Sequence, residues 1–238
     1  MRLLTAIPVF NEAAHIDAVL GEVLGHTDEV LVVDDGSTDA TSERLAAFPM
    51  VRVIRHPRNQ GYGAGLRSAF RYTLKHDYDG LVTIDCDGQH QPSMIPEIAA
   101  PLVEADIVSG SRYLRVFDPA QRPPEARRKI NVEVTRWLNE CLGFNLTDGF
   151  CGFKAYRASA LAKFELSETG YAMPLEVWVQ AAQHELKVVE VAVPLLYLDE
   201  SRAFGGSLDD ADYRLGHYRG VFQAAMKRAN REVAGGCC

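Results

Sequence analysis

Residues 81–89 read Leu81-Val82-Thr83-Ile84-Asp85-Cys86-Asp87-Gly88-Gln89, an apolar run that ends in two acidic residues. Short runs rich in β-branched residues are typical of strands buried on both faces of a parallel sheet. In such sheets, ligands bind beyond the carboxyl ends of the strands. The stretch therefore predicts a buried parallel strand over 81–84 whose carboxyl end carries a polar site.

The first half of the chain alternates such runs with helical patterns. Further strands are expected at 3–9, 30–33, 51–54 and 107–108, and helices at 13–24, 40–47, 64–75 and 94–103. Ser37 and Ser93 are the expected helix N-caps. This alternation predicts an α/β fold, a Rossmann-like, mostly parallel sheet flanked by helices on both faces.

The second half has a different pattern and no repeats. A proline-rich connection over 117–124 leads into a helix over 125–142; strands are expected at 150–156 and 188–193, helices at 175–183 and 213–228, and a polar loop at 199–210. We therefore predict a single domain over residues 1–230, followed by a tail over 231–238.

Composition narrows the class of protein. The 238 residues are 47% hydrophobic and 24% charged, with a formal net charge of −7, which argues against a nucleic-acid partner. The five cysteines lack the spacing of a zinc site or a disulfide framework, as in proteins of a reducing cytoplasm. Neither a signal peptide nor an apolar run of the roughly 20 residues that span a bilayer is expected.

The pair Asp85 and Asp87, with Gln89 behind it, predicts a metal site. Carboxylate and amide oxygens suit Mg²⁺ or Mn²⁺, which also take phosphate oxygens as ligands. A cation would then bridge these acids to an anionic diphosphate. The alternative is a solvated turn, but the position at a strand end favours the metal.

Two other strand ends carry polar residues. Asp34 and Asp35 follow the second strand, where they either form a turn or bind the ribose or base of a nucleotide. Asn11 is expected to cap the next helix, which leaves Phe10 and Glu12 for ligand contact.

Residues 59–65 are rich in glycine and open the helix expected at 64–75. Their spacing is Gly-x-Gly-x-Gly, Leu66 follows, and the stretch does not come after the first strand, so a dinucleotide-binding fingerprint is disfavoured. Close packing of a helix on a strand explains these glycines.

Together, five motifs in this order resemble family 2 of the inverting glycosyltransferases, which have the GT-A fold. They are Ile7-Pro8-Val9-Phe10-Asn11-Glu12, the run over 32–39, the run over 59–64, Asp85-Cys86-Asp87-Gly88-Gln89-His90 and Ser109-Gly110-Ser111-Arg112-Tyr113. The nearest branch is that of the dolichyl- or polyprenyl-phosphate mannosyltransferases and glucosyltransferases.

The resemblance implies a metal-dependent transfer of a hexose, mannose or glucose, from a GDP- or UDP-linked donor. It places donor binding in residues 1–115 and acceptor binding in 116–230. The implied donor-binding residues are Pro8, Phe10, Glu12, Val33, Asp35, Asp85, Cys86, Asp87, Gln89, Arg112 and Arg202, with Asp85, Asp87 and Gln89 holding Mg²⁺ or Mn²⁺.

Asp87, Arg112, Glu176 and Arg202 are the implied catalytic residues. Glu176 either acts as a base for a hydroxyl acceptor or is a solvated acid favoured by a helix dipole; a phosphate acceptor needs no base. Arg202 belongs to a late loop in which Leu208 stands where the resembling enzymes carry Lys, and their apolar tail is missing. These departures leave the acceptor open between a polyprenyl phosphate and a soluble hydroxyl, and a homodimer or a non-catalytic nucleotide-sugar-binding subunit also remains open.

The helices expected at 213–228 and 125–142 both carry an apolar stripe with basic residues around it. Such a pattern indicates either an interfacial helix at a membrane or a helix packed on the core. Because the stripes are narrow, core packing is favoured. We therefore expect a cytoplasmic protein, with peripheral membrane contact as the alternative.

Overall fold

The computed structural model describes residues 1–118, 123–196 and 206–230. Its seven-stranded sheet has the order β3-β2-β1-β4-β6-β5-β7. The strands are β1 (Leu3–Val9), β2 (Val30–Asp34), β3 (Arg52–Arg55), β4 (Gly80–Thr83), β5 (Ile107–Ser111), β6 (Lys154–Arg157) and β7 (Val188–Ala192). Only β6 runs against its neighbours, β4 and β5. The mostly parallel sheet predicted from the sequence is thus confirmed.

Eight α-helices are formed by the described residues. They are α1 (Ile16–Val23), α2 (Thr41–Leu45), α3 (Tyr62–Lys75), α4 (Ile95–Ala99), α5 (Glu125–Leu142), α6 (Ala158–Leu161), α7 (Met173–Gln183) and α8 (Ala211–Arg228). Three 3-10 turns accompany them, η1 (Pro92–Met94), η2 (Ala100–Val103) and η3 (Gly206–Asp209).

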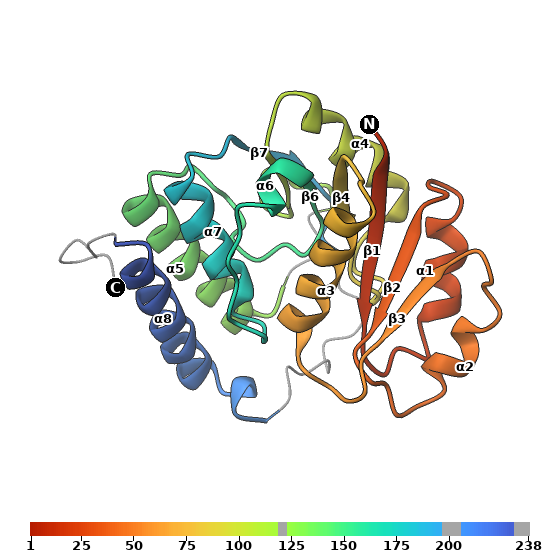
Figure 1. Cartoon of the computed structure of the whole chain (residues 1–238). Helices are drawn as coiled ribbons and strands as arrows, with labels where there is room; N and C mark the ends of the chain where they lie inside the picture. Colours follow the sequence, from red (N-terminus) through yellow and green to blue (C-terminus); the bar gives the residue numbers. More distant parts are fainter. Residues whose placement is uncertain (119–122, 197–205, 231–238) are drawn as a thin grey trace.

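Side chains of the central strands alternate between two apolar layers. On β2, Val30 and Val32 pack with α1 and α4, whereas Leu31 and Val33 pack with α3 and α7. The two-residue period of a strand produces this alternation, and both faces of the sheet are therefore buried. Figure 1 shows α1 and α2 at one end of the sheet and α3 in front of its middle.

A third apolar cluster joins α5, α7 and α8, which lie together at the other end of the molecule (Figure 1). Trp137, Trp178 and Phe222 are its largest fully buried side chains. The stripe of α8 is part of this cluster, which confirms core packing over an interfacial helix. Among the described residues, no helix is long and apolar enough to cross a membrane.

Three local expectations were wrong. The helix expected at 94–103 is divided into η1, α4 and η2 because Pro92, Pro96 and Pro101 lack the amide that a helix interior needs. Neither Ser37 nor Ser93 is an N-cap: the Ser37 amide donates to the Asp34 carboxylate instead. Asn11 does not cap α1 either, because its side chain accepts hydrogen bonds from the amides of residues 38 and 39.

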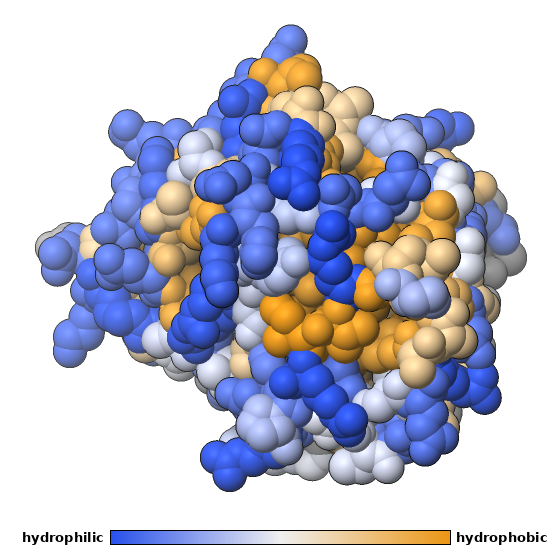
Figure 2. Space-filling view, turned by 45° about the vertical axis from the view of Figure 1, so that its right-hand side comes forward, coloured by the Kyte–Doolittle hydropathy of each residue, from blue (hydrophilic) through white to orange (hydrophobic). Residues whose placement is uncertain are grey.

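Hydrophilic residues cover much of the face that is turned forward in Figure 2. The view brings the right-hand side of Figure 1 forward and shows a central apolar patch, with smaller apolar areas at the top and on the left.

The glycines at the start of α3 allow close contact with the segment that precedes α7. A Cβ atom on Gly61 would lie 2.4 Å from the Thr169 carbonyl oxygen, and one on Gly63 would lie 2.7 Å from the Met173 Cβ. Gly65 alone faces a strand, with a Cβ position 3.3 Å from Pro8. The expected packing of helix on strand therefore explains only one of the three glycines.

We predict that Gly63→Ala lowers the free energy of unfolding by about 1–3 kcal/mol, because the added methyl group overlaps Met173 and backbone atoms. Gly216→Ala on α8 is the matched control: nothing lies within 4 Å of its Cβ position, so the substitution should stabilise the helix by about 0.5–1 kcal/mol. Urea denaturation of both variants measures the difference. Equal stability of the two would contradict the packing described above.

Candidate active site

The carboxyl ends of β1, β2, β4 and β5 face a cavity of about 420 Å³. Nine residues expected at the donor site line it: Pro8, Phe10, Glu12, Asp35, Asp85, Cys86, Asp87, Gln89 and Arg112. Helices α5 and α8 contribute Arg127, Arg214 and Tyr218 to the opposite wall. The cavity is thus enclosed by the two halves of the chain.

Asp85 is held in place by two neighbours that the sequence did not single out. Its carboxylate accepts a hydrogen bond of 2.9 Å from the Tyr62 hydroxyl and lies 3.4 Å from the His90 Nε2 atom. Burial raises the pKa of Asp85, and the negative charge of Asp87 adds to this shift while His90 opposes it. A cation beside both acids would relieve this repulsion.

Asp87 also lines the cavity, and its carboxylate has fewer partners on the protein than that of Asp85. Its Oδ1 atom accepts a hydrogen bond of 3.0 Å from the Gln89 amide, which shapes the turn after β4. Within the described part of the chain, no hydrogen bond to its Oδ2 atom is found. Asp87 is therefore better placed than Asp85 to coordinate a ligand directly.

Gly152 makes the position of Asp85 sterically possible. A Cβ atom at residue 152 would lie 2.1 Å from the Asp85 Oδ2 atom. Cys86, between the two acids, has its side chain in the apolar layer beneath, where it is 2% exposed. Cys86 therefore lines the cavity, but its thiol is buried away from a ligand.

The Asp35 carboxylate organises the start of α3. It accepts hydrogen bonds from the amides of Gln60 and Gly61, and its Oδ1 atom lies 2.6 Å from the His56 Nδ1 atom. His56 Nε2 is in turn 2.8 Å from the Ser68 hydroxyl. Asp35 therefore borders the cavity but already has partners on the protein.

Its neighbour Asp34 is fully buried and forms a turn, with hydrogen bonds from the Ser37 amide and the Ser42 hydroxyl. Burial would raise the pKa of Asp34, but these hydrogen bonds outweigh it and lower the pKa. Asp34 thus follows the turn alternative and does not line the cavity.

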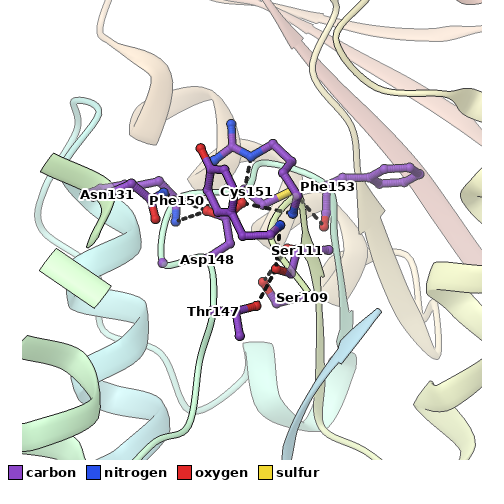
Figure 3. A network of polar contacts seen from close by, with 12 residues as sticks. Ser109, Ser111, Asn131, Thr147, Asp148, Phe150, Cys151 and Phe153 are labelled. Atoms are coloured by element: carbon purple, nitrogen blue, oxygen red, sulfur yellow. Dashed lines mark hydrogen bonds and ion pairs between the residues drawn. The ribbon is translucent and has the colours of Figure 1, made fainter. Parts of the chain in front are cut away.

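Arg112 reaches the cavity from the end of β5 and is held by a buried carboxylate. Its Nε and Nη2 atoms lie 2.7 and 2.9 Å from the oxygens of Asp148, which is fully buried. Figure 3 shows Asn131 and Phe150 pointing toward Asp148; the Asn131 side chain and the Phe150 amide donate to it at 2.8 and 3.1 Å. Burial alone would raise the pKa of Asp148, but Arg112 and these donors hold it well below its usual range.

The sequence profile described as "Glycosyl transferase family 2" matches residues 5–164. The chain belongs to this family. It is 34% identical to an undecaprenyl-phosphate mannosyltransferase of Micrococcus luteus over 89% of this chain and 91% of that protein. It is also 28% identical to a polyprenol monophosphomannose synthase of Mycolicibacterium smegmatis, over 91% of this chain and 86% of the other.

Solved structures of glycosyltransferases share the fold. Glucosyl-3-phosphoglycerate synthase of Mycobacterium tuberculosis, crystallised with Mn²⁺, UDP and glucosyl-3-phosphoglycerate, matches with a TM-score of 0.72 at 21% identity, over 98% of this chain and 82% of that one. Mannosyl-3-phosphoglycerate synthase of Rubrobacter xylanophilus matches with a TM-score of 0.69 at 16% identity, over 97% and 75% of the two chains. At these identities the likeness concerns the fold alone.

In this glycosyltransferase, Glu176 is not at the cavity, which corrects both interpretations of that residue. Its side chain is 1% exposed, so it is not a solvated acid. Its carboxylate accepts hydrogen bonds from the Ser167 amide and hydroxyl and the Glu168 amide, and pairs with Arg228 at the end of α8. Glu176 therefore joins three segments and has no access to an acceptor.

Val33 and Arg202 also differ from what the sequence implied. Val33 is fully buried and does not line the cavity. Its side chain points into the apolar layer between the sheet and α3. Arg202 and most of the polar loop expected at 199–210 lie outside the described residues.

Several functional-site residues were missed from sequence. Tyr62 belongs to the glycine-rich stretch and Gly152 to an expected strand, but Tyr62 is 23 positions from Asp85 in the sequence and Gly152 is much farther away, so only the fold brings them together. Arg127 and Arg214 were assigned to basic rims of helices. Nothing in the helical periodicity distinguishes a residue that faces the cavity from one that faces solvent.

We predict that Glu176→Gln leaves the turnover of folded enzyme unchanged and lowers the free energy of unfolding by about 1–3 kcal/mol, because the buried network loses its negative charge and one of its two acceptor oxygens. Removal of a general base would instead slow turnover by about 100-fold or more. Arg228→Gln, which removes the other half of the pair, serves as the matched variant. A large loss of turnover in Glu176→Gln alone would restore the catalytic interpretation.

Proposed function

We propose that this glycosyltransferase moves a hexose, mannose or glucose, from a GDP- or UDP-linked donor to a polyprenyl phosphate, with inversion at the anomeric carbon. The observation that carries this proposal is the distribution of charge in the cavity. Asp85 and Asp87 follow β4, whereas Arg112, Arg127 and Arg214 come from three other segments and line the same space. The acids suit a cation bound to a diphosphate, and the arginines suit the anions that react.

Asp85 and Asp87 would hold Mg²⁺ or Mn²⁺, with Gln89 as a further oxygen donor. The fit rests on the chemistry of the donors, since carboxylate and amide oxygens are hard ligands on one turn. In the described part of the chain, no three His, Cys, Asp or Glu side chains form a metal site by themselves. The donor's phosphate oxygens would complete the coordination, and a bound ion neutralises charge on the leaving diphosphate.

Arg112 would stabilise the same leaving group. Asp148 keeps its guanidinium charged and fixed in orientation, because burial is offset by a bidentate pair. A hydrogen-bond donor whose position is fixed before the reaction does not need to reorient as negative charge develops on the diphosphate. Pro8, Phe10, Glu12 and Asp35, at the ends of β1 and β2, are proposed to surround the nucleoside.

A phosphate acceptor agrees with the position of Glu176. A phosphate oxygen is already ionised at neutral pH, so it attacks without a general base. Arg127 and Arg214 would attract this phosphate to the wall opposite the donor. The names of the Micrococcus and Mycolicibacterium relatives support the same acceptor class. The proposed division into a donor half, 1–115, and an acceptor half, 116–230, is supported by the position of Arg127 and Arg214 on α5 and α8.

A lipid-linked acceptor and a nucleotide sugar meet at the cytoplasmic face of a membrane. We therefore propose that the enzyme works there, as a peripheral protein.

We predict that Asp87→Ala reduces transfer by about 100-fold or more and removes the Mn²⁺-dependent part of nucleotide binding, because the proposed cation would lose the carboxylate that has the fewest partners on the protein. Thermal shift with UDP or GDP, each with and without Mn²⁺, measures binding, since a ligand of the folded state raises the melting temperature. Asp28→Ala is the control, an exposed acid at the opposite end of β2. Wild-type turnover in Asp87→Ala, or turnover that persists in EDTA, would disprove the assignment.

A further inference from the structure

A second hollow of about 560 Å³ adjoins the active-site cavity. The two share Arg112 and Tyr113, which form the wall between them. The apolar part of this hollow, which we call the side groove, is lined by Tyr113, Val116, Phe117, Pro123 and Leu195. Any ligand that fills both spaces must pass along Tyr113.

The side groove lies beside an unusual concentration of exposed apolar residues. Leu114, Val116 and Phe117 are 47, 72 and 43% exposed, although they occupy three of four consecutive positions. The other large apolar side chains on the surface are mostly scattered along the sequence. Single exposed apolar residues need no explanation, whereas a cluster beside a reactive site indicates a ligand or partner.

Cationic groups lie against the aromatic rings of this region. The Arg128 guanidinium is 3.7 Å from the centre of the Tyr113 ring, and the Arg115 guanidinium is 5.0 Å from that of Phe117. Two acids, Asp118 and Glu125, also border the hollow, and Glu125 is paired with Lys129 at 2.7 Å. The region therefore combines an apolar lining with positive charge toward the cavity.

We propose that the side groove binds the isoprene units next to the phosphate of the acceptor. This inference rests on the proposed polyprenyl phosphate acceptor and specifies where its chain lies. With the phosphate in the cavity near Arg112, the chain leaves past Tyr113 and lies against Val116 and Phe117. The groove thus matches a molecule with an anionic head directly joined to an apolar chain.

The continuity of the two spaces separates this occupant from others. A flat bilayer would reach the exposed Val116 but would not extend along Tyr113 to the cavity, because the groove is concave. A soluble hydroxyl acceptor would leave the apolar lining in water. Only an apolar chain attached to the reacting group fills both the cavity and the groove.

Chain-length selectivity tests the proposal without membranes or detergent. Prenyl phosphate has one isoprene unit and geranyl phosphate has two, and both are soluble. We expect kcat/KM to be about tenfold higher for geranyl phosphate in the wild type, a ratio that corresponds to about 1.4 kcal/mol. Val116→Asp and Phe117→Ala should bring this ratio close to one, with nucleotide binding unchanged.

Val103→Asp is the matched control. Val103 is 67% exposed and lies in η2, at the opposite end of β5 from the groove, so its variant should keep the wild-type ratio. Both acceptors are assayed on one preparation of each variant. A loss of folded protein therefore cancels in the ratio.

The outcomes distinguish the groove from the function on which it rests. Transfer to both phosphates with equal efficiency in the wild type would overturn the groove alone. A ratio that Val116→Asp leaves unchanged would do the same, and reduced sedimentation of that variant with phosphatidylglycerol vesicles would then identify a membrane contact. Absence of transfer to either phosphate, with the nucleotide sugar still bound, would overturn the acceptor class and the groove together.

Discussion

The buried carboxylate of Asp148 connects the parts of the molecule that form the active site. The carboxylate pairs with Arg112 after β5 and accepts a hydrogen bond from Asn131 on α5. The backbone amides of Thr147 and Asp148 donate to Glu190 on β7. Burial of an ion pair has a large desolvation cost. Removal of one partner leaves an unpaired buried charge and lowers the free energy of unfolding by about 3–5 kcal/mol. The cavity thus keeps its shape because this charge is satisfied only when sheet, helix and connecting segment are all in place.

Acidic and basic side chains line the same cavity, but they come from different parts of the fold. Asp85 and Asp87 share a turn, whereas the arginines belong to three separate elements: Arg112 follows β5, and Arg127 and Arg214 lie on α5 and α8 in the second half of the chain. In the proposed reaction, the anionic groups of donor and acceptor would lie between the acidic turn, which would hold a cation, and the guanidinium groups. The two anions repel each other, so opposite charges held in fixed positions are needed to bring them close.

Local sequence patterns predicted the cavity residues at the strand ends far better than those on the helices of the second half. The strands that end at Val9, Asp34 and Thr83 are short apolar runs whose carboxyl ends must meet in a parallel sheet, so Asp85, Asp87 and Phe10 were predicted at the cavity. Glu176 was misjudged because its place on α7 says nothing about Ser167 or Arg228, which approach from distant segments. Val33 was misjudged because alternation, which the resemblance ignored, turns it toward α3.

The antiparallel strand β6 lies between β4 and β5, although it follows both in the chain by many residues. During synthesis on the ribosome, β1 to β4 can pair as soon as they emerge, but β4 and β5 keep open edges until residue 157 is available. Unpaired strand edges are templates for association with other chains. A nascent chain stalled before β6 would therefore be aggregation-prone, and the edges of β4 and β5 are covered only when β6, and then β7 on the other side of β5, have been made.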